Sequence, residues 1–257
     1  MKTVNISLGN LAEVKLHAFS DWHIGDKACK IADIRAMIAE VTNSANDYVI
    51  LNGDLMNNAT KASVSDCYAE ELTPMEQLAT LRDLLEPIKD KILMATCGNH
   101  EARTYKADGI DLMALLMREL GIEERYCREG GVLFLHLGAG CDRHKNRPYT
   151  YSLYVTHGSG GGRKEGAKAV RLADMASIVD VDIYIHSHTH LPMIMKQSFF
   201  RTNLQGASVA QVDKLFVNTS SLLDYGGYGQ TYEFKPNSTA NPVIYLNGRK
   251  REYQAKL

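Results

Sequence analysis

Apolar and polar positions follow two different periods in the first half of the chain. Residues 14–20 alternate with a period of two, and the apolar run at 47–52 is nearly continuous, which predicts a half-buried strand and a buried parallel strand. Between them, apolar residues such as Ile34 and Ile38 recur at helical spacing, so an amphipathic helix is expected over 30–44. A third strand is expected at 91–96, which makes strands and helices alternate as in α/β proteins.

Two further helices are indicated by their ends and by their apolar faces. Thr73 and Glu76 have the spacing of a capping box, which predicts a helix over 73–86. Residues 111–120 carry leucines on one side and are followed by a glycine, so another helix is expected there. The polar stretch at 55–73 is read as a loop or a short helix.

From residue 132 onward the pattern changes to short strands. One helix is expected at 166–179, and strands are expected at 132–137, 150–156, 182–186, 193–195, 214–218 and 243–246. Together the two halves predict an α/β fold in which two mixed β-sheets pack face to face and are flanked by helices, a four-layer α/β/β/α sandwich. No repeat or linker divides the sequence, so we expect a single domain over residues 1–257.

Composition limits the class of partner and the compartment. Lys and Arg number 29 against 30 for Asp and Glu, so binding to nucleic acid through bulk positive charge is not expected, although a local basic groove stays open. Five cysteines occur without any CxxC pair, which is typical of reduced thiols. With neither a signal-like apolar segment near residue 1 nor a run of membrane-spanning length, we expect a cytoplasmic protein with no membrane contact. The oligomeric state is left open.

Side chains that bind metals follow five of the expected strands. Because open α/β sheets present ligands at the carboxyl ends of their strands, these side chains are expected to converge. Carboxylates, imidazoles and one carboxamide suit two divalent ions, and the mixed nitrogen and oxygen set favours Mn²⁺, Fe, Co²⁺, Ni²⁺ or Zn²⁺ over Mg²⁺ or Ca²⁺. A bridging ligand needs two oxygens, which suits Asp54 in the middle of the set. In chain order the set is Asp21, His23, Asp54, Asn99, His157, His188 and His190.

The order of these residues resembles the calcineurin-like metallophosphoesterase superfamily, whose motifs are D-x-H, GD, GNH[DE], a single H and GHxH. One position departs from that pattern, because Ser187 stands where the glycine before the last H-x-H is usual. The resemblance implies two metal sites that share Asp54. The first would be held by Asp21, His23, Asp54 and His190, and the second by Asp54, Asn99, His157 and His188.

The resemblance also implies a reaction, the in-line attack of a metal-bridging hydroxide on phosphorus. Asp54 and His100 are the expected catalytic residues, with His100 protonating the leaving oxygen. Glu101 is a candidate to orient His100. Two divalent transition-metal ions are expected, Mn²⁺ first, with Fe, Zn²⁺, Ni²⁺ and Co²⁺ as alternatives.

Basic residues near the motifs are candidates for binding substrate. Arg103 lies two residues beyond Glu101, and Arg163 and Lys164 follow a run of three glycines after His157; glycines let a backbone approach a ligand closely. The basic run at 143–147 is read as a solvated hairpin, with a second phosphate site as the alternative.

The expected function is hydrolysis of a phosphoester, with a phosphodiester or a nucleotide-like ester preferred. The preference rests on His100, because an unactivated alkoxide leaving group needs a proton. The alternatives are a nuclease acting on single-stranded DNA or RNA, a phosphomonoesterase or protein phosphatase, and a non-catalytic scaffold on the same fold. Metal content and the choice between diester and monoester substrates would separate them.

Overall fold

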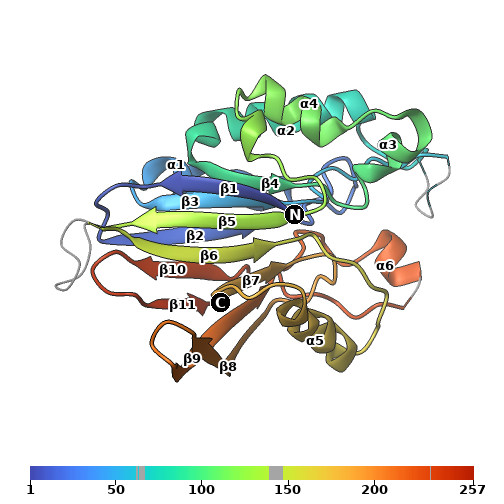
Figure 1. The fold of residues 1–257 in the computed structure, drawn as a ribbon. Coiled ribbons are helices and arrows are strands. Elements are labelled where there is room, and N and C mark those ends of the chain that lie inside the picture. The colour runs from blue at the N-terminus through green and yellow to red at the C-terminus, as the bar shows by residue number, and fades with distance from the viewer. Residues whose placement is uncertain (62, 64–66, 139–146, 232) are drawn as a thin grey trace.

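The structure, a computed structural model, describes residues 1–61, 63, 67–138, 147–231 and 233–257. Its strands form two mixed sheets (Figure 1). The five-stranded sheet has the order β11 (Tyr253–Lys256), β10 (Val243–Asn247), β2 (Glu13–Phe19), β3 (Asp47–Asn52) and β4 (Ile92–Thr96). The six-stranded sheet has the order β1 (Lys2–Ser7), β5 (Gly131–Leu137), β6 (Tyr149–Val155), β7 (Ile183–His186), β9 (Ser208–Asn218) and β8 (Met193–Asn203).

Helices cover the outer faces of both sheets, which confirms the predicted sandwich with flanking helices. On the side of β3 and β4 lie α1 (Ile31–Asn43), α2 (Pro74–Leu85) and α4 (Leu112–Glu119), and near the opposite face lies α5 (Glu165–Asp174) (Figure 1). The remaining helical segments are α3 (Ala102–Asp108), α6 (Gly227–Thr231) and the short 3-10 turns Glu86–Lys91, Glu123–Arg125 and Met175–Ser177. In the part of the chain that the structure describes, no helix has the length and apolar character needed to cross a bilayer.

The alternation of side chains along the strands produces three apolar layers. Leu16 and Ile50 face inward and pack in the cluster that joins the two sheets, together with Leu133 and others. The next residues along the same strands point the other way, so Leu51 packs against the helical layer formed by α1, α2 and α4. A smaller cluster lies beneath α5, where Tyr184 stacks on a phenylalanine of β9. Burial on both faces explains the nearly continuous apolar run at 47–52.

Most of the predicted elements are present. β3 spans the expected residues, and the capping box of α2 is formed by Thr73 and Glu76. β1 and β11 were not predicted, since each is a short edge strand with little burial. The expected strands at 193–195 and 214–218 extend into a long hairpin whose outer part is exposed. Residues 143–146 of the basic run lie outside the described residues.

The parallel strands bring the site together. β2, β3 and β4 run parallel to one another, as do β6, β7 and β9. Their carboxyl ends therefore meet at one edge of the sandwich, and the polar motifs follow these ends.

Candidate metal centre

One group of donor atoms comes from the loops after β2 and β7. Asp21 and His23 are buried, and together with His190 they place their donor atoms within 4.8 Å of one another. Asp21 Oδ1 lies 3.1 Å from His190 Nε2, and the Nε2 atoms of His23 and His190 are 3.4 Å apart. Two nitrogens bound to one ion at about 2.1 Å stand about 3.0–3.4 Å apart, so this spacing suits a shared cation.

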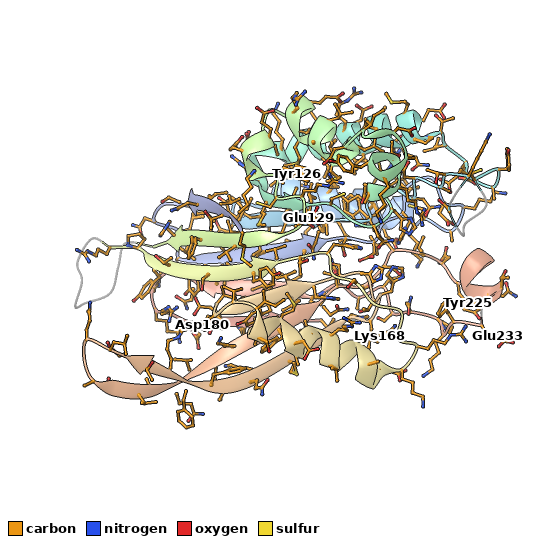
Figure 2. All side chains as sticks on the ribbon, turned by 45° about the vertical axis from the view of Figure 1, so that its right-hand side comes forward. Tyr126, Glu129, Lys168, Asp180, Tyr225 and Glu233 are labelled. Carbon is orange, nitrogen blue, oxygen red and sulfur yellow. The ribbon has the colours of Figure 1, made fainter. Side chains whose placement is uncertain are left out.

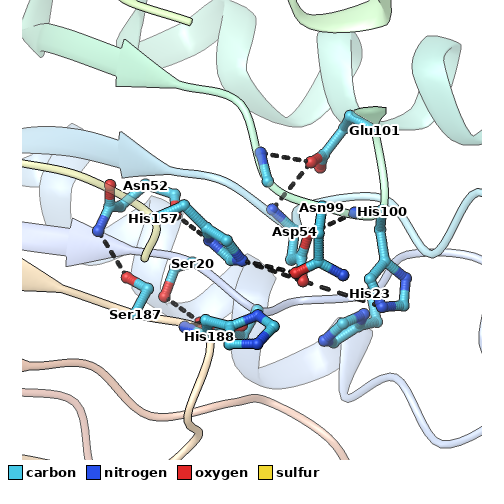
Figure 3. Close-up of polar contacts among 12 residues, drawn as sticks. Ser20, His23, Asn52, Asp54, Asn99, His100, Glu101, His157, Ser187 and His188 are labelled. Atoms are coloured by element: carbon cyan, nitrogen blue, oxygen red, sulfur yellow. Dashed lines mark hydrogen bonds and ion pairs between the residues drawn. The ribbon is translucent and has the colours of Figure 1, made fainter. Parts of the chain in front are cut away.

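A second group comes from the ends of β3, β4, β6 and β7 (Figure 3). Asp54, His157 and His188 again have donor atoms within 4.8 Å of one another. His157 Nε2 lies 3.2 Å from Asp54 Oδ2 and 3.2 Å from Asn99 Oδ1. Asp54 also forms a compact group with His23 and His100. The carboxylate of Asp54 therefore stands between the two groups, where a bridging ligand would have to be.

The backbone at these positions is turned into the left-handed region. Such a φ costs a residue other than glycine about 1–3 kcal/mol and is concentrated at functional sites. Backbone hydrogen bonds hold the turns, including Asp21 N–H to Gly53 O at 3.0 Å and His23 N–H to Asp54 O at 3.1 Å. The residues and their φ angles are Asp21 (51°), His23 (51°), Asp54 (52°), His188 (66°) and His190 (55°).

One buried donor atom supports the fit of a metal. Among the described residues, Asp21 Oδ1 is one of six buried side-chain atoms without a hydrogen-bond partner. An unsatisfied buried polar atom costs about 1–3 kcal/mol, and a cation bound to this oxygen would remove that cost. Imidazole nitrogens with carboxylate and carboxamide oxygens form a donor set for a divalent transition metal.

The profile of the calcineurin-like phosphoesterases matches residues 14–192 of this sequence, which include every donor described above. The chain belongs to the calcineurin-like phosphoesterase family. The comparison with curated protein sequences found no match.

Several solved structures resemble the fold of this phosphoesterase at low sequence identity. A protein from Streptococcus pneumoniae TIGR4 described as a predicted phosphoesterase is 13% identical, with 96% of this chain and 99% of that chain covered and a TM-score of 0.36. Vps29 of Entamoeba histolytica in complex with Zn²⁺ is 11% identical, with 95% and 97% covered and a TM-score of 0.41. A metallophosphoesterase from Sphaerobacter thermophilus is 12% identical, with 94% and 90% covered and a TM-score of 0.40. Likeness at this level carries no information on substrate.

Charges in the phosphoesterase site shift the ionisation of its carboxylates and imidazoles. Burial alone would raise the pKa of Asp21, but the imidazoles of His190 and His157 together outweigh burial and the pKa falls to about 2. Burial alone would lower the pKa of His157, yet the adjacent carboxylate of Asp54 raises it to about 10. Each of these carboxylates is thus ionised at neutral pH, in the state that binds a cation.

His100 lies beside the donor groups, as the sequence predicts, and its ring is held by two contacts. Nδ1 donates to Asn57 O at 2.7 Å, and Arg103 Nη2 donates to Nε2 at 3.1 Å. Burial lowers the pKa of His100, and the guanidinium of Arg103 lowers it further. The carboxylate of Asp54 raises this pKa, but by less than the two lowering effects together. His100 is therefore a neutral imidazole in this arrangement, with its Nε2 lone pair turned to Arg103.

The hypothesis that Glu101 orients His100 is wrong. The buried carboxylate of Glu101 accepts from four backbone N–H groups instead: Oε1 from Leu55 and Met56 at 2.6 and 3.0 Å, and Oε2 from Asp54 and Gly98 at 3.0 and 2.9 Å. Gly98 permits this close approach, because a Cβ there would lie 2.1 Å from Asp54 N. Glu101 thus fixes the backbone of Asp54 and acts on the ligand loops rather than on the imidazole.

The three candidate substrate-binding cations differ in their placement. Arg103 is at the site, and it also donates from Nη1 to Asn57 O at 2.9 Å. Arg163 and Lys164 are exposed, and the Arg163 guanidinium lies over the ring of Phe234, 5.1 Å from its centroid. Their role in binding substrate stays a prediction, as do the assigned roles of the metal ligands.

Two residues that contact the site had no signal strong enough to be predicted. Asn57 lies in the polar stretch at 55–73, for which the sequence predicted no definite secondary structure. Its backbone carbonyl accepts hydrogen bonds from both His100 and Arg103. Lys168 on α5 (Figure 2) donates from Nζ to Thr189 O at 2.7 Å, between the two histidines of the last motif. Only the fold brings these segments to the ligands.

Proposed function

We propose that this phosphoesterase is a dinuclear enzyme that hydrolyses a phosphodiester or a nucleotide-like ester. The observation that carries the proposal is the position of Asp54, whose carboxylate belongs to one donor group with His23 and His100 and to another with His157 and His188. The first ion would be held by Asp21, His23, Asp54 and His190, and the second by Asp54, Asn99, His157 and His188. When bound, the pair would neutralise the phosphoryl oxygens and acidify water.

His100 and Arg103 supply the groups that act on the leaving oxygen. To donate a proton from Nε2, His100 must lose the hydrogen bond that Arg103 now donates to that atom at 3.1 Å. A phosphate oxygen is the stronger acceptor for a guanidinium. Substrate phosphate would therefore draw Arg103 away and free the Nε2 lone pair to take up a proton from solvent, which the imidazolium would then give to the alkoxide. This need for a proton favours a diester over an activated monoester.

Three further assignments accompany this proposal. We propose Mn²⁺ as the metal, since the donor set mixes imidazole with carboxylate and carboxamide oxygens. We propose a cytoplasmic location, supported by the free thiols of Cys29, Cys67, Cys97 and Cys127. We also propose that residues 1–257 form one domain, supported by the apolar cluster that joins both sheets.

The test combines metal analysis with a choice of substrates. The purified protein is stripped with EDTA, reloaded with Mn²⁺, analysed for metal, and assayed on bis-p-nitrophenyl phosphate and on p-nitrophenyl phosphate. We expect two ions per chain and faster turnover of the diester. Faster turnover of the monoester would instead identify a phosphatase, and cleavage of single-stranded DNA or RNA would identify a nuclease. If the protein bound no metal and turned over neither substrate, the enzyme assignment would be overturned in favour of a scaffold.

A further inference from the structure

A continuous row of buried polar side chains lies next to the candidate metal centre, and Figure 3 shows three of its members, Asn52, Ser187 and Ser20. Asn52 Nδ2 donates to Ser187 Oγ at 2.6 Å, and Ser187 Oγ lies 2.8 Å from Thr219 Oγ1. Thr219 Oγ1 lies 2.6 Å from Ser20 Oγ, which donates to Asp21 Oδ2 at 2.6 Å. All five residues are buried. The row therefore ends on a carboxylate that belongs to the first donor group.

Counting protons fixes the donors at the two ends of this row. Asn52 Nδ2 also donates to Thr156 O at 2.9 Å, and a carbonyl oxygen can only accept, so the amide nitrogen faces Ser187. At the other end, the carboxylate of Asp21 can only accept, which uses the single proton of Ser20.

The middle of the row depends on the single proton of Thr219. Thr219 Oγ1 donates to Ser187 Oγ, which also accepts from Asn52 Nδ2. Because Ser20 uses its proton on Asp21, the contact between Thr219 and Ser20 draws on the proton of Thr219 as well. The Thr219 hydroxyl therefore connects the two ends of the row, and hydrogen bonds in such a network polarise one another.

Ser187 is the member of the row that departs from the usual motif. Its φ is not in the left-handed region, so the backbone there does not require glycine. A glycine would remove the hydroxyl oxygen that accepts from both Asn52 Nδ2 and Thr219 Oγ1 and would leave one buried N–H of Asn52 unsatisfied. The serine is therefore explained by the hydrogen bonds of its side chain with the neighbouring amide and hydroxyl groups, and not by the conformation of the turn.

We propose that Ser187 and Thr219 are positioning residues that fix the carboxylate of Asp21 for metal binding, an inference that rests on the proposed dinuclear function. The row holds Asp21 Oδ2, which leaves Oδ1, the oxygen with no hydrogen-bond partner among the described residues, directed at His190. Its other end is tied to the second donor group, because His157 Nδ1 donates to Asn52 O at 2.7 Å. One set of hydrogen bonds thus orients ligands of both ions.

The test compares two substitutions at Thr219 that separate hydroxyl from packing. Thr219→Val keeps the shape and removes the hydroxyl, whereas Thr219→Ser keeps the hydroxyl and removes a methyl group. Calorimetric titration of the metal-free proteins with Mn²⁺ is expected to give a dissociation constant about 10–100-fold higher for Thr219→Val, the usual effect of losing a group that orients a ligand. Thr219→Ser is expected to bind within about threefold of wild type.

Two more variants complete the experiment. Ser187→Ala is expected to weaken Mn²⁺ binding as Thr219→Val does. If a urea titration shows that Thr219→Val is not folded, Ser187→Ala takes its place in the comparison. Ser220→Ala is the matched control, since Ser220 is buried next to Thr219 but donates to Ser238 O at 2.7 Å, outside the row.

Three outcomes decide the inference. Wild-type affinity in both Thr219→Val and Ser187→Ala would overturn it while leaving the dinuclear function intact. Equal weakening by Thr219→Ser and Thr219→Val would also overturn it, because packing would then be the cause. A wild-type protein that binds no Mn²⁺ would overturn the proposed function and this inference with it.

Discussion

The carboxylate of Glu101 joins two ligand loops through four backbone N–H groups. Substitution with Gln keeps the shape of the side chain but replaces one oxygen with an NH₂ group. Because each oxygen accepts two of these hydrogen bonds, either orientation of the amide leaves two buried N–H groups facing a donor. The substitution therefore tests the role that the structure gives to Glu101.

The expected loss follows from the count of unsatisfied groups. A buried donor without a partner costs about 1–3 kcal/mol, so two cost about 2–6 kcal/mol. Removing the negative charge offsets part of this, because burial and the neighbouring Asp54 already disfavour the charged form and raise the pKa of Glu101 to about 7. We expect the free energy of unfolding to fall by about 2–4 kcal/mol after this offset.

The assay is urea unfolding of the EDTA-treated protein, followed by circular dichroism. Glu119→Gln is the matched control, because Glu119 forms a half-exposed ion pair with Arg82 at 3.7 Å, and such pairs contribute less than about 1 kcal/mol. If Glu101→Gln unfolded at the same urea concentration as the control and with the same slope, the four hydrogen bonds would not hold the loops, and the reasoning would be refuted.

Three further predictions concern the ligands, the imidazole and the stability in acid. Asp54→Asn is expected to abolish turnover and to reduce the metal content of both sites, because an amide is a poor bridging ligand; two ions per chain by elemental analysis would contradict this. His100→Asn is expected to retain Mn²⁺ while lowering kcat by about 10²–10⁴, the usual contribution of acid–base help, and loss of metal would show that His100 is a ligand instead. Burial raises the pKa of Asp47, but hydrogen bonds from Ser44 and His17 lower it more, so the pKa of the folded state lies below the usual value of an aspartate. Asp47 thus contributes stability above about pH 4 that is lost as the pH falls through its folded pKa. Asp47→Asn should lower the urea midpoint at pH 7 and make the midpoint depend less on pH below about pH 4. An unchanged dependence of the midpoint on acid pH would exclude this contribution.

The sequence by itself indicated the donor residues that the structure brings together and most of the strands. Local patterns are enough for that, because burial on one or both faces dictates the apolar period of β2 and β3. The capping box of α2 likewise depends on two residues three apart. The motifs at the strand ends indicated the family. Because these strands run parallel, the motifs lie at one edge of the sandwich.

Only the tertiary structure decided how the donors are held. The row next to the centre joins Asn52 to Ser187 across 135 positions and Ser20 to Thr219 across 199, and no local period encodes such pairs. Glu101 was assigned to its neighbour His100, although it lies against a loop that is 45 to 47 residues away in sequence. A hydrogen bond depends on the position of both partners in space, and that position is set by the packing of the two sheets.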